Sequence, residues 1–112
     1  MRVSLLLCAV LFAAACGSPQ SEQGSRGAAA LARYGCGSCH TVKGIRGANG
    51  LVGPPLSGVG SRTYIAGMLE NNPENMSAWI RNPKAINPKT AMPNVGVGEG
   101  DAADIAAYLQ SQ

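Results

Sequence analysis

The chain is short of large side chains, which limits how it can fill a core. Its 112 residues include five aromatic ones, Phe12, Tyr34, Tyr64, Trp79 and Tyr108. A protein core alone gives little margin of stability below roughly 70–100 residues. Disorder does not fit, because 46% of the residues are hydrophobic and 13% are charged. The composition therefore predicts one domain whose core is completed by something other than protein.

The first 15 residues have the pattern of an export signal. A positive charge at Arg2 precedes an apolar run that only Ser4 interrupts. The run is too short to span a hydrocarbon core of ~30 Å, which takes about 20 helical residues. Its end, AAACG, is similar to a bacterial lipobox, although Ala13 stands where leucine is usual. We expect residues 1–15 to be removed and Cys16 to carry a lipid anchor; ordinary cleavage, leaving a free thiol, is the alternative.

Residues 16–26 have the composition of a flexible linker. The sequence GSPQSEQGSR at 17–26 holds no large apolar residue. Ten such residues have a root-mean-square reach of roughly 17 Å as a flexible linker. The folded domain is thus expected over residues 27–112. The formal charge of +3 is too small and too scattered for a nucleic-acid-binding protein.

The chemistry of the chain is concentrated in the sequence CGSCH at residues 36–40. A thioredoxin-like redox pair would follow a buried strand, but the alanine-rich GAAALARYG precedes this one. A structural zinc site needs four ligands. After export the chain offers three cysteines and one histidine, but one of these cysteines lies at the tethered end, which disfavours a zinc site. In a covalent haem c, the thiols of Cys36 and Cys39 form thioethers with the porphyrin vinyl groups and His40 binds the iron. This last interpretation also supplies the missing apolar body of the core.

The sixth position of the iron has three methionine candidates. His40 is the only histidine, so a second histidine cannot bind there. Met68 and Met76 fall in helix-like patterns and suit a core. Met92 lies in an extended stretch between two prolines, with no helical face from which to pack. Met92 is therefore the predicted ligand; a core role for it, another ligand or an open position are the alternatives.

Local patterns predict helices and no strands. We expect a short helix over 27–34, another over 61–69, and one that begins after Asn72 and is stopped by Asn82-Pro83. Apolar residues at helical spacing predict a closing helix over 101–110 with Asp101 as its cap. The expected fold is all-α: three to five short helices around the haem, joined by loops rich in glycine and proline.

From residue 27 to residue 112 the chain resembles the class I cytochromes c. The resemblance is carried by CGSCH, by the turn GPPL at 53–56, by the spacing from Asn82-Pro83 to Met92, and by Tyr108-Leu109 in the closing helix. Two features depart from the family: Ala32 stands where an aromatic residue often packs, and lysines around the haem edge are sparse.

The resemblance implies a role for further residues. The carbonyl of Pro54 would accept a hydrogen bond from the His40 ring, which fixes the ring's tautomer. Gly27 would be the glycine at which the first and last helices cross. Other residues would contact the haem: Leu56 by packing, Trp79 on the methionine side, and Arg62 and Thr90 near a propionate.

The resemblance also implies a function, that of a monohaem electron carrier rather than an enzyme. It would exchange electrons with a terminal oxidase and a bc1-type complex or a dehydrogenase, at the periplasmic face of a membrane, as a monomer or as a subunit of a complex. Independently of the resemblance, we expect the few cations Lys43, Arg46, Lys84 and Lys89 to lie near the haem edge. A peroxidase-like enzyme or sensor with an open sixth position is the alternative, but it needs a distal acid–base group that the sequence does not offer near Met92.

Overall fold

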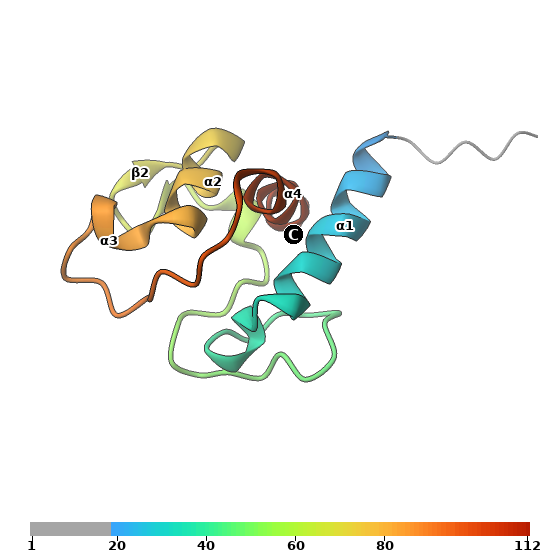
Figure 1. Ribbon diagram of the computed structural model, residues 1–112, viewed down its shortest axis with the longest axis horizontal. Helices are drawn as coiled ribbons and strands as arrows, with labels where there is room; N and C mark the ends of the chain where they lie inside the picture. The colour runs from blue at the N-terminus through green and yellow to red at the C-terminus, as the bar shows by residue number, and fades with distance from the viewer. Residues whose placement is uncertain (1–18) are drawn as a thin grey trace, which may run out of the picture.

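The computed structural model describes residues 19–112, which fold into helices around one apolar core (Figure 1). The expected export signal and Cys16 lie outside the described residues. The elements, in chain order, are α1 (Pro19–Arg33), 3-10 turns at Cys36–Ser38 and Val59–Ser61, β1 (Tyr64–Ile65), β2 (Leu69–Glu70), α2 (Pro73–Arg81), α3 (Pro83–Ile86) and α4 (Glu99–Gln110). The prediction of a mainly helical fold is confirmed. No helix within residues 19–112 has the length and apolar character to cross a membrane.

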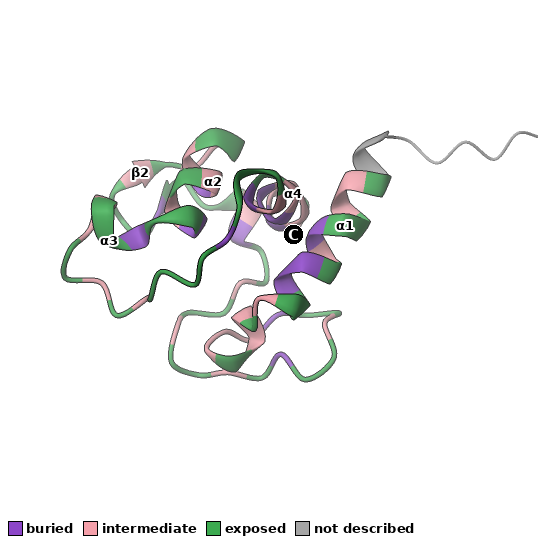
Figure 2. Ribbon diagram, in the orientation of Figure 1, coloured by how far each residue is buried: buried purple, intermediate pink, exposed green. Residues whose placement is uncertain are grey.

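The first and last helices pack closely because Gly27 has no side chain at the point where they cross. A Cβ atom added at Gly27 would lie 2.6 Å from the backbone carbonyl carbon of Asp104 and 2.9 Å from the Cβ of Tyr108. Both distances are shorter than any ordinary contact, so a side chain at this position would force α1 and α4 apart. Figure 2 shows the buried residues of α1 on the side that faces α4. Ala32 is exposed, and its neighbour Leu31 is fully buried in the core.

The prediction of a flexible linker is wrong for residues 19–26, which form the first half of α1. Pro19 begins the helix, where the missing N–H of a proline costs nothing. Arg26 then binds the carboxylate of Asp104 in α4, with Nε 3.1 Å from Oδ2. A polar segment of this composition would not hold a helix by itself, and packing of the following turn on α4 supplies the stability.

The prediction of a helix over 61–69 is also wrong. These residues form a 3-10 turn and an antiparallel hairpin in which Ile65 pairs with Leu69. Ala66 and Gly67 at the tip have φ values of 52° and 68°, and they are the two central residues of a turn that the N–H of Met68 closes by donating to the carbonyl of Ile65 at 2.9 Å. Met68 follows the tip and is 51% exposed, so it is not the core methionine that a helix would have made it.

Two asparagines delimit α2 as expected. The side chain of Asn72 accepts a hydrogen bond from the backbone N–H of Asn75 at 2.8 Å, and Pro73 follows at the first helical position. Asn82 ends α2, and its side chain also accepts from Ala85 to begin α3. Between these caps, Met76 and Ile80 face the core.

Asp101 does not cap α4, contrary to the prediction. The helix begins two residues earlier, and Gly98 holds the cap position. Asp101 lies in the first turn and accepts a 2.6 Å hydrogen bond from the hydroxyl of Tyr34, while Arg33 lies 3.1 Å away. Its carboxylate therefore joins the end of α1 to the start of α4.

Candidate haem site

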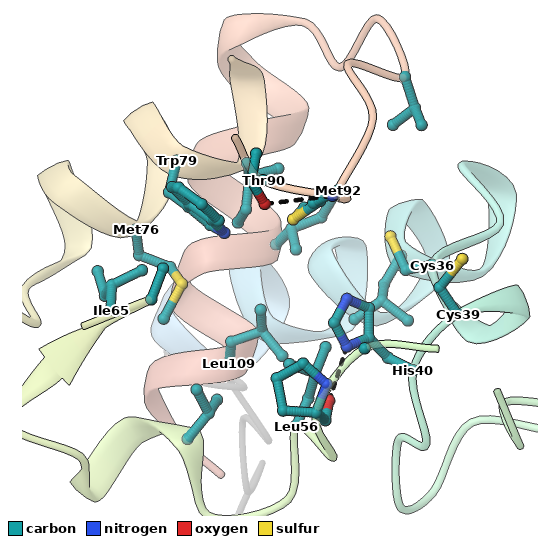
Figure 3. Close-up of a pocket in the computed structure, with 18 of the residues that line it drawn as sticks. Cys36, Cys39, His40, Leu56, Ile65, Met76, Trp79, Thr90, Met92 and Leu109 are labelled. Atoms are coloured by element: carbon teal, nitrogen blue, oxygen red, sulfur yellow. Dashed lines mark hydrogen bonds between the residues drawn. The ribbon is translucent and has the colours of Figure 1, made fainter. Parts of the chain in front are cut away.

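One apolar cavity of about 350 Å³ opens between the helices and the loops (Figure 3). This size suits a small-molecule or cofactor site. Its apolar walls come from α1, α2, α4 and the hairpin. The nine haem-contact residues that the sequence singled out all line it: Cys36, Cys39, His40, Pro54, Leu56, Arg62, Trp79, Thr90 and Met92. They come from five separate segments of the chain, and only the fold brings them together.

The cysteines and His40 are held on one tight turn. Gly35 begins this turn in the left-handed conformation, with φ 74°. The backbone N–H groups of Cys39 and His40 both donate to the carbonyl of Cys36, at 3.2 and 3.0 Å. Both thiols are free. Burial raises the pKa of Cys36, and the nearby Cys39 adds to the shift. The turn therefore presents two thiols and one imidazole to the same side of the cavity (Figure 3).

The orientation of His40 is fixed from two sides. Its Nδ1 lies 2.7 Å from the carbonyl oxygen of Pro54, the contact that the resemblance implies. Because a carbonyl only accepts hydrogen bonds, Nδ1 is the donor, which leaves Nε2 as the ring nitrogen that can bind an iron. Gly53 also packs against the ring, since a Cβ there would be 2.7 Å from Nδ1 and 2.9 Å from Nε2.

Met92 approaches the cavity from the side opposite His40 (Figure 3). It is half-buried, in an extended segment that follows α3. Its backbone N–H donates to the hydroxyl oxygen of Thr90 at 3.2 Å, and the ammonium group of Lys84 donates to the carbonyl of Thr90. This local bonding gives the segment a defined course at the cavity wall.

Arg62 is the only Asp, Glu, Lys or Arg residue among the described residues that line the cavity. Its Nη2 donates to the carbonyl of Pro55 at 2.7 Å, which holds the guanidinium group beside the loop that orients His40. The cations expected near the haem edge, Lys43, Arg46, Lys84 and Lys89, do not line the cavity.

The residues present fit a covalently attached haem. Two thiols and an imidazole on one turn are the attachment chemistry of haem c. A thioether faces them across an apolar space, and one cation stands at its wall, where a carboxylate-bearing group could pair with it. No cluster of three or more His, Cys, Asp or Glu side chains that could hold a bare metal ion occurs within residues 19–112. A haem bound here supplies an iron that can change oxidation state by one electron.

Sequence reasoning missed the glycines that close the site. A Cβ at Gly50 would lie 2.5 Å from the backbone of Cys39, and Gly53 has the same close approach to His40. The sequence does show two glycines in the loop that follows the CXXCH motif. Their close contacts are with another turn of the chain, which the sequence does not reveal. Tyr64 and Ile65, which also line the cavity, were missed because their segment was predicted to be helical.

Comparison with known proteins supports the same identification. The family profile for cytochrome c matches residues 24–112. The chain is similar to proteins named cytochrome c oxidase subunit 2: it is 43% identical over 60 residues to one from Alkalihalophilus pseudofirmus, covering 53% of this chain and 18% of the relative. To those from Bacillus sp. strain PS3 and Bacillus subtilis it is 44% identical over 39 residues and 36% over 55 residues. These matches cover 35% and 49% of this chain and 11% and 15% of the relatives.

The matched segment thus spans less than a fifth of the length of each of these relatives. No solved structure matches the chain significantly. The family profile covers most of the chain, and the CXXCH turn lies in a cavity suited to a macrocycle. The chain belongs to the cytochrome c family, whose covalently bound haem c serves electron transfer.

Proposed function

We propose that this protein is a one-electron carrier in which His40 and Met92 are the two axial ligands of the haem iron. The observation that carries the proposal is the arrangement of these side chains, which approach one apolar cavity from opposite sides. With both axial positions taken by the chain, no position is left for a substrate. The iron then changes its oxidation state and does no further chemistry.

The surrounding residues favour fast and reversible transfer. A thioether ligand such as Met92 favours the reduced iron and raises the potential. The apolar cavity wall acts in the same direction, because the oxidised state carries one more positive charge. The bond from His40 to Pro54 fixes the imidazole, and attachment at two cysteines limits movement between the two states.

We further propose that the partners are respiratory. A terminal oxidase is the expected acceptor, and a bc1-type complex or a dehydrogenase the expected donor. Support for the acceptor comes from the similarity to proteins named cytochrome c oxidase subunit 2. The signal-like residues 1–15 and Cys16 support export and anchoring at the periplasmic face of a membrane, where such partners are found.

Replacing Met92 by alanine tests the ligand and the function together. The thioethers of Cys36 and Cys39 form without the sixth ligand, so haem should stay attached. The red absorption band of sulfur bound to oxidised iron should disappear, and the potential should fall within the span of about 0.8 V that axial ligands control. A Met92→Ala variant with the spectrum and potential of the wild type would show that the ligand is elsewhere.

The other methionines provide matched controls. Met76 is 3% exposed, so Met76→Ala should cost about 2–5 kcal/mol of stability and keep the absorption band. Met68→Ala should change neither property, because this side chain lies largely in solvent. The peroxidase-like alternative predicts high-spin features in the wild-type spectrum. It also needs a distal acid or base, and the described cavity wall holds no carboxylate and no second histidine.

A further inference from the structure

Asn71, which follows β2, joins separate parts of the chain through one side chain. Its amide nitrogen donates to the backbone carbonyls of Val59 and Arg62, at 2.9 and 2.7 Å. Its amide oxygen accepts from the side chain of Gln110, at the end of α4, at 2.7 Å. Because carbonyls only accept hydrogen bonds, the nitrogen is the atom that faces Val59 and Arg62. The donors and the oxygen of this amide are therefore all in use.

The carbonyls that Asn71 binds belong to the wall of the cavity. The side chains of Val59 and Arg62 both line the cavity, whereas Asn71 does not. The backbone N–H of Asn71 adds a bond to the carbonyl of Thr63, at 3.0 Å. We call residues 59–63 the wall segment. Asn71 thus lies behind the wall segment and holds it at three carbonyls.

The last turn of α4 supports the same segment. A Cβ at Gly60 would lie 2.7 Å from the backbone carbonyl carbon of Gln110, so the wall segment packs directly on this helix. The side chain of Gln110 reinforces the contact through Asn71. Leu109, the residue before it, lines the cavity. The wall segment is therefore fixed to a helix that itself forms part of the cavity, the kind of support that keeps a functional side chain in place.

The wall segment carries the charge of Arg62. A positive charge beside the cavity opposes the extra positive charge of an oxidised iron, and so favours the reduced state. This effect depends on how closely the guanidinium group is held, because water and salt screen a charge that moves out into solvent. The guanidinium group is bonded to the carbonyl of Pro55, and the backbone of Arg62 is bonded to Asn71.

We propose that Asn71 is a positioning residue, which holds Arg62 at the cavity and thereby sets the redox potential of the bound haem. The proposal rests on the electron-carrier function proposed above. Without the amide of Asn71, the carbonyls of Val59 and Arg62 lose a donor and are better satisfied by water. The wall segment then moves outward and takes the guanidinium group with it. The potential falls, since the charge of Arg62 acts through more solvent.

Redox titrations of the wild-type holoprotein, Asn71→Ala, Arg62→Gln and the double variant test this role. Arg62→Gln removes the charge, so its fall in potential sets the scale. Asn71→Ala should lower the potential by about half of that fall or more, and in the Arg62→Gln background it should add almost nothing, because no charge is left to displace. A fall of equal size in both backgrounds would mean that Asn71 acts only on the general structure of the wall, and would overturn the proposal. An unchanged potential in Asn71→Ala would do the same.

Asn75→Ala is the matched control. The side-chain amide of Asn75 donates to the carbonyl of Glu70 in β2 at 2.9 Å, and neither residue lines the cavity. Its backbone N–H, which binds the side chain of Asn72, is kept in the alanine variant. The potential should therefore be that of the wild type. A fall like that of Asn71→Ala would show that loss of any amide near the hairpin lowers the potential, against a specific role of Asn71.

Hydrogen exchange in the wild-type holoprotein tests the same bonds without a variant that has to fold. NMR follows the side-chain N–H protons of each asparagine. Those of Asn71 should exchange about tenfold more slowly than those of Asn75, because two carbonyls accept from the first amide and one from the second. Equal exchange rates would overturn the positioning role and leave the carrier function standing. A wild-type protein without a reversible one-electron couple would overturn both.

Discussion

Replacing Gly53 by alanine should damage the haem site while adding a single methyl group. The new Cβ would lie 2.7 Å from Nδ1 of His40, whereas ordinary contact begins at 3.4 Å. Cε1 of the ring would be closer still, so the imidazole would have to retreat by more than 0.7 Å, or the loop would have to withdraw by as much. If the ring moves away from Pro54, their 2.7 Å hydrogen bond stretches to the limit at which such a bond is lost. If the loop moves, the 2.7 Å bond from Gly53 to Cys39 is lost instead.

Either movement has a cost that can be estimated. Inserting a methyl group into a well-packed region typically costs 1–3 kcal/mol. In a domain of this size that corresponds to a fall in melting temperature of roughly 4–8 °C for each kcal/mol. We also expect weaker binding of the sixth ligand, since the iron is drawn after a displaced His40.

Urea unfolding and the red absorption band of the oxidised holoprotein measure the two effects. Gly100→Ala is the matched control, because nothing lies within 4 Å of a Cβ at this position in α4. Alanine there should stabilise the protein by about 0.5–1 kcal/mol. Equal stability and equal spectra for Gly53→Ala and Gly100→Ala would refute the close packing of Gly53 on His40.

Three further results are expected. The hydrogen bond from Tyr34 lowers the pKa of Asp101 from 3.8. The ionised carboxylate therefore stabilises the folded state above pH 3.8, and this contribution is lost as the pH falls through the lowered pKa. In the Asp101→Asn variant, the free energy of unfolding should depend less steeply on pH below about pH 4. Electron transfer to the proposed oxidase should slow only mildly with salt, and a steep decline would reveal a concentrated cationic patch. Cys16→Ser should release the protein from membranes, whereas an unmodified Cys16 in the intact mass of the wild type would disprove the anchor.

The sequence by itself determined the chemistry and the helix ends that depend on neighbouring residues. The CXXCH spacing identifies the prosthetic group because two thiols and an imidazole must meet one macrocycle, and all three lie within one turn of chain. The helix start at Asn72 was predictable for the same reason, since its bond to Asn75 spans three residues. The short supply of large side chains likewise pointed to a core completed by a cofactor.

Where the local conformational preference of a segment was weak, only the tertiary structure determined its conformation. Residues 19–26 are helical because α4 holds the following turn, through the bare backbone of Gly27 and the carboxylate of Asp104. Residues 61–69 form a hairpin because two adjacent residues adopt positive φ, an outcome that the helix-like spacing of their apolar residues conceals. The close approach of Gly53 to His40 joins turns that the sequence leaves independent. Contacts of this kind depend on packing between segments that are distant in the sequence. Such packing is decisive because a short polar or mixed segment gains too little from its own hydrogen bonds to select one conformation.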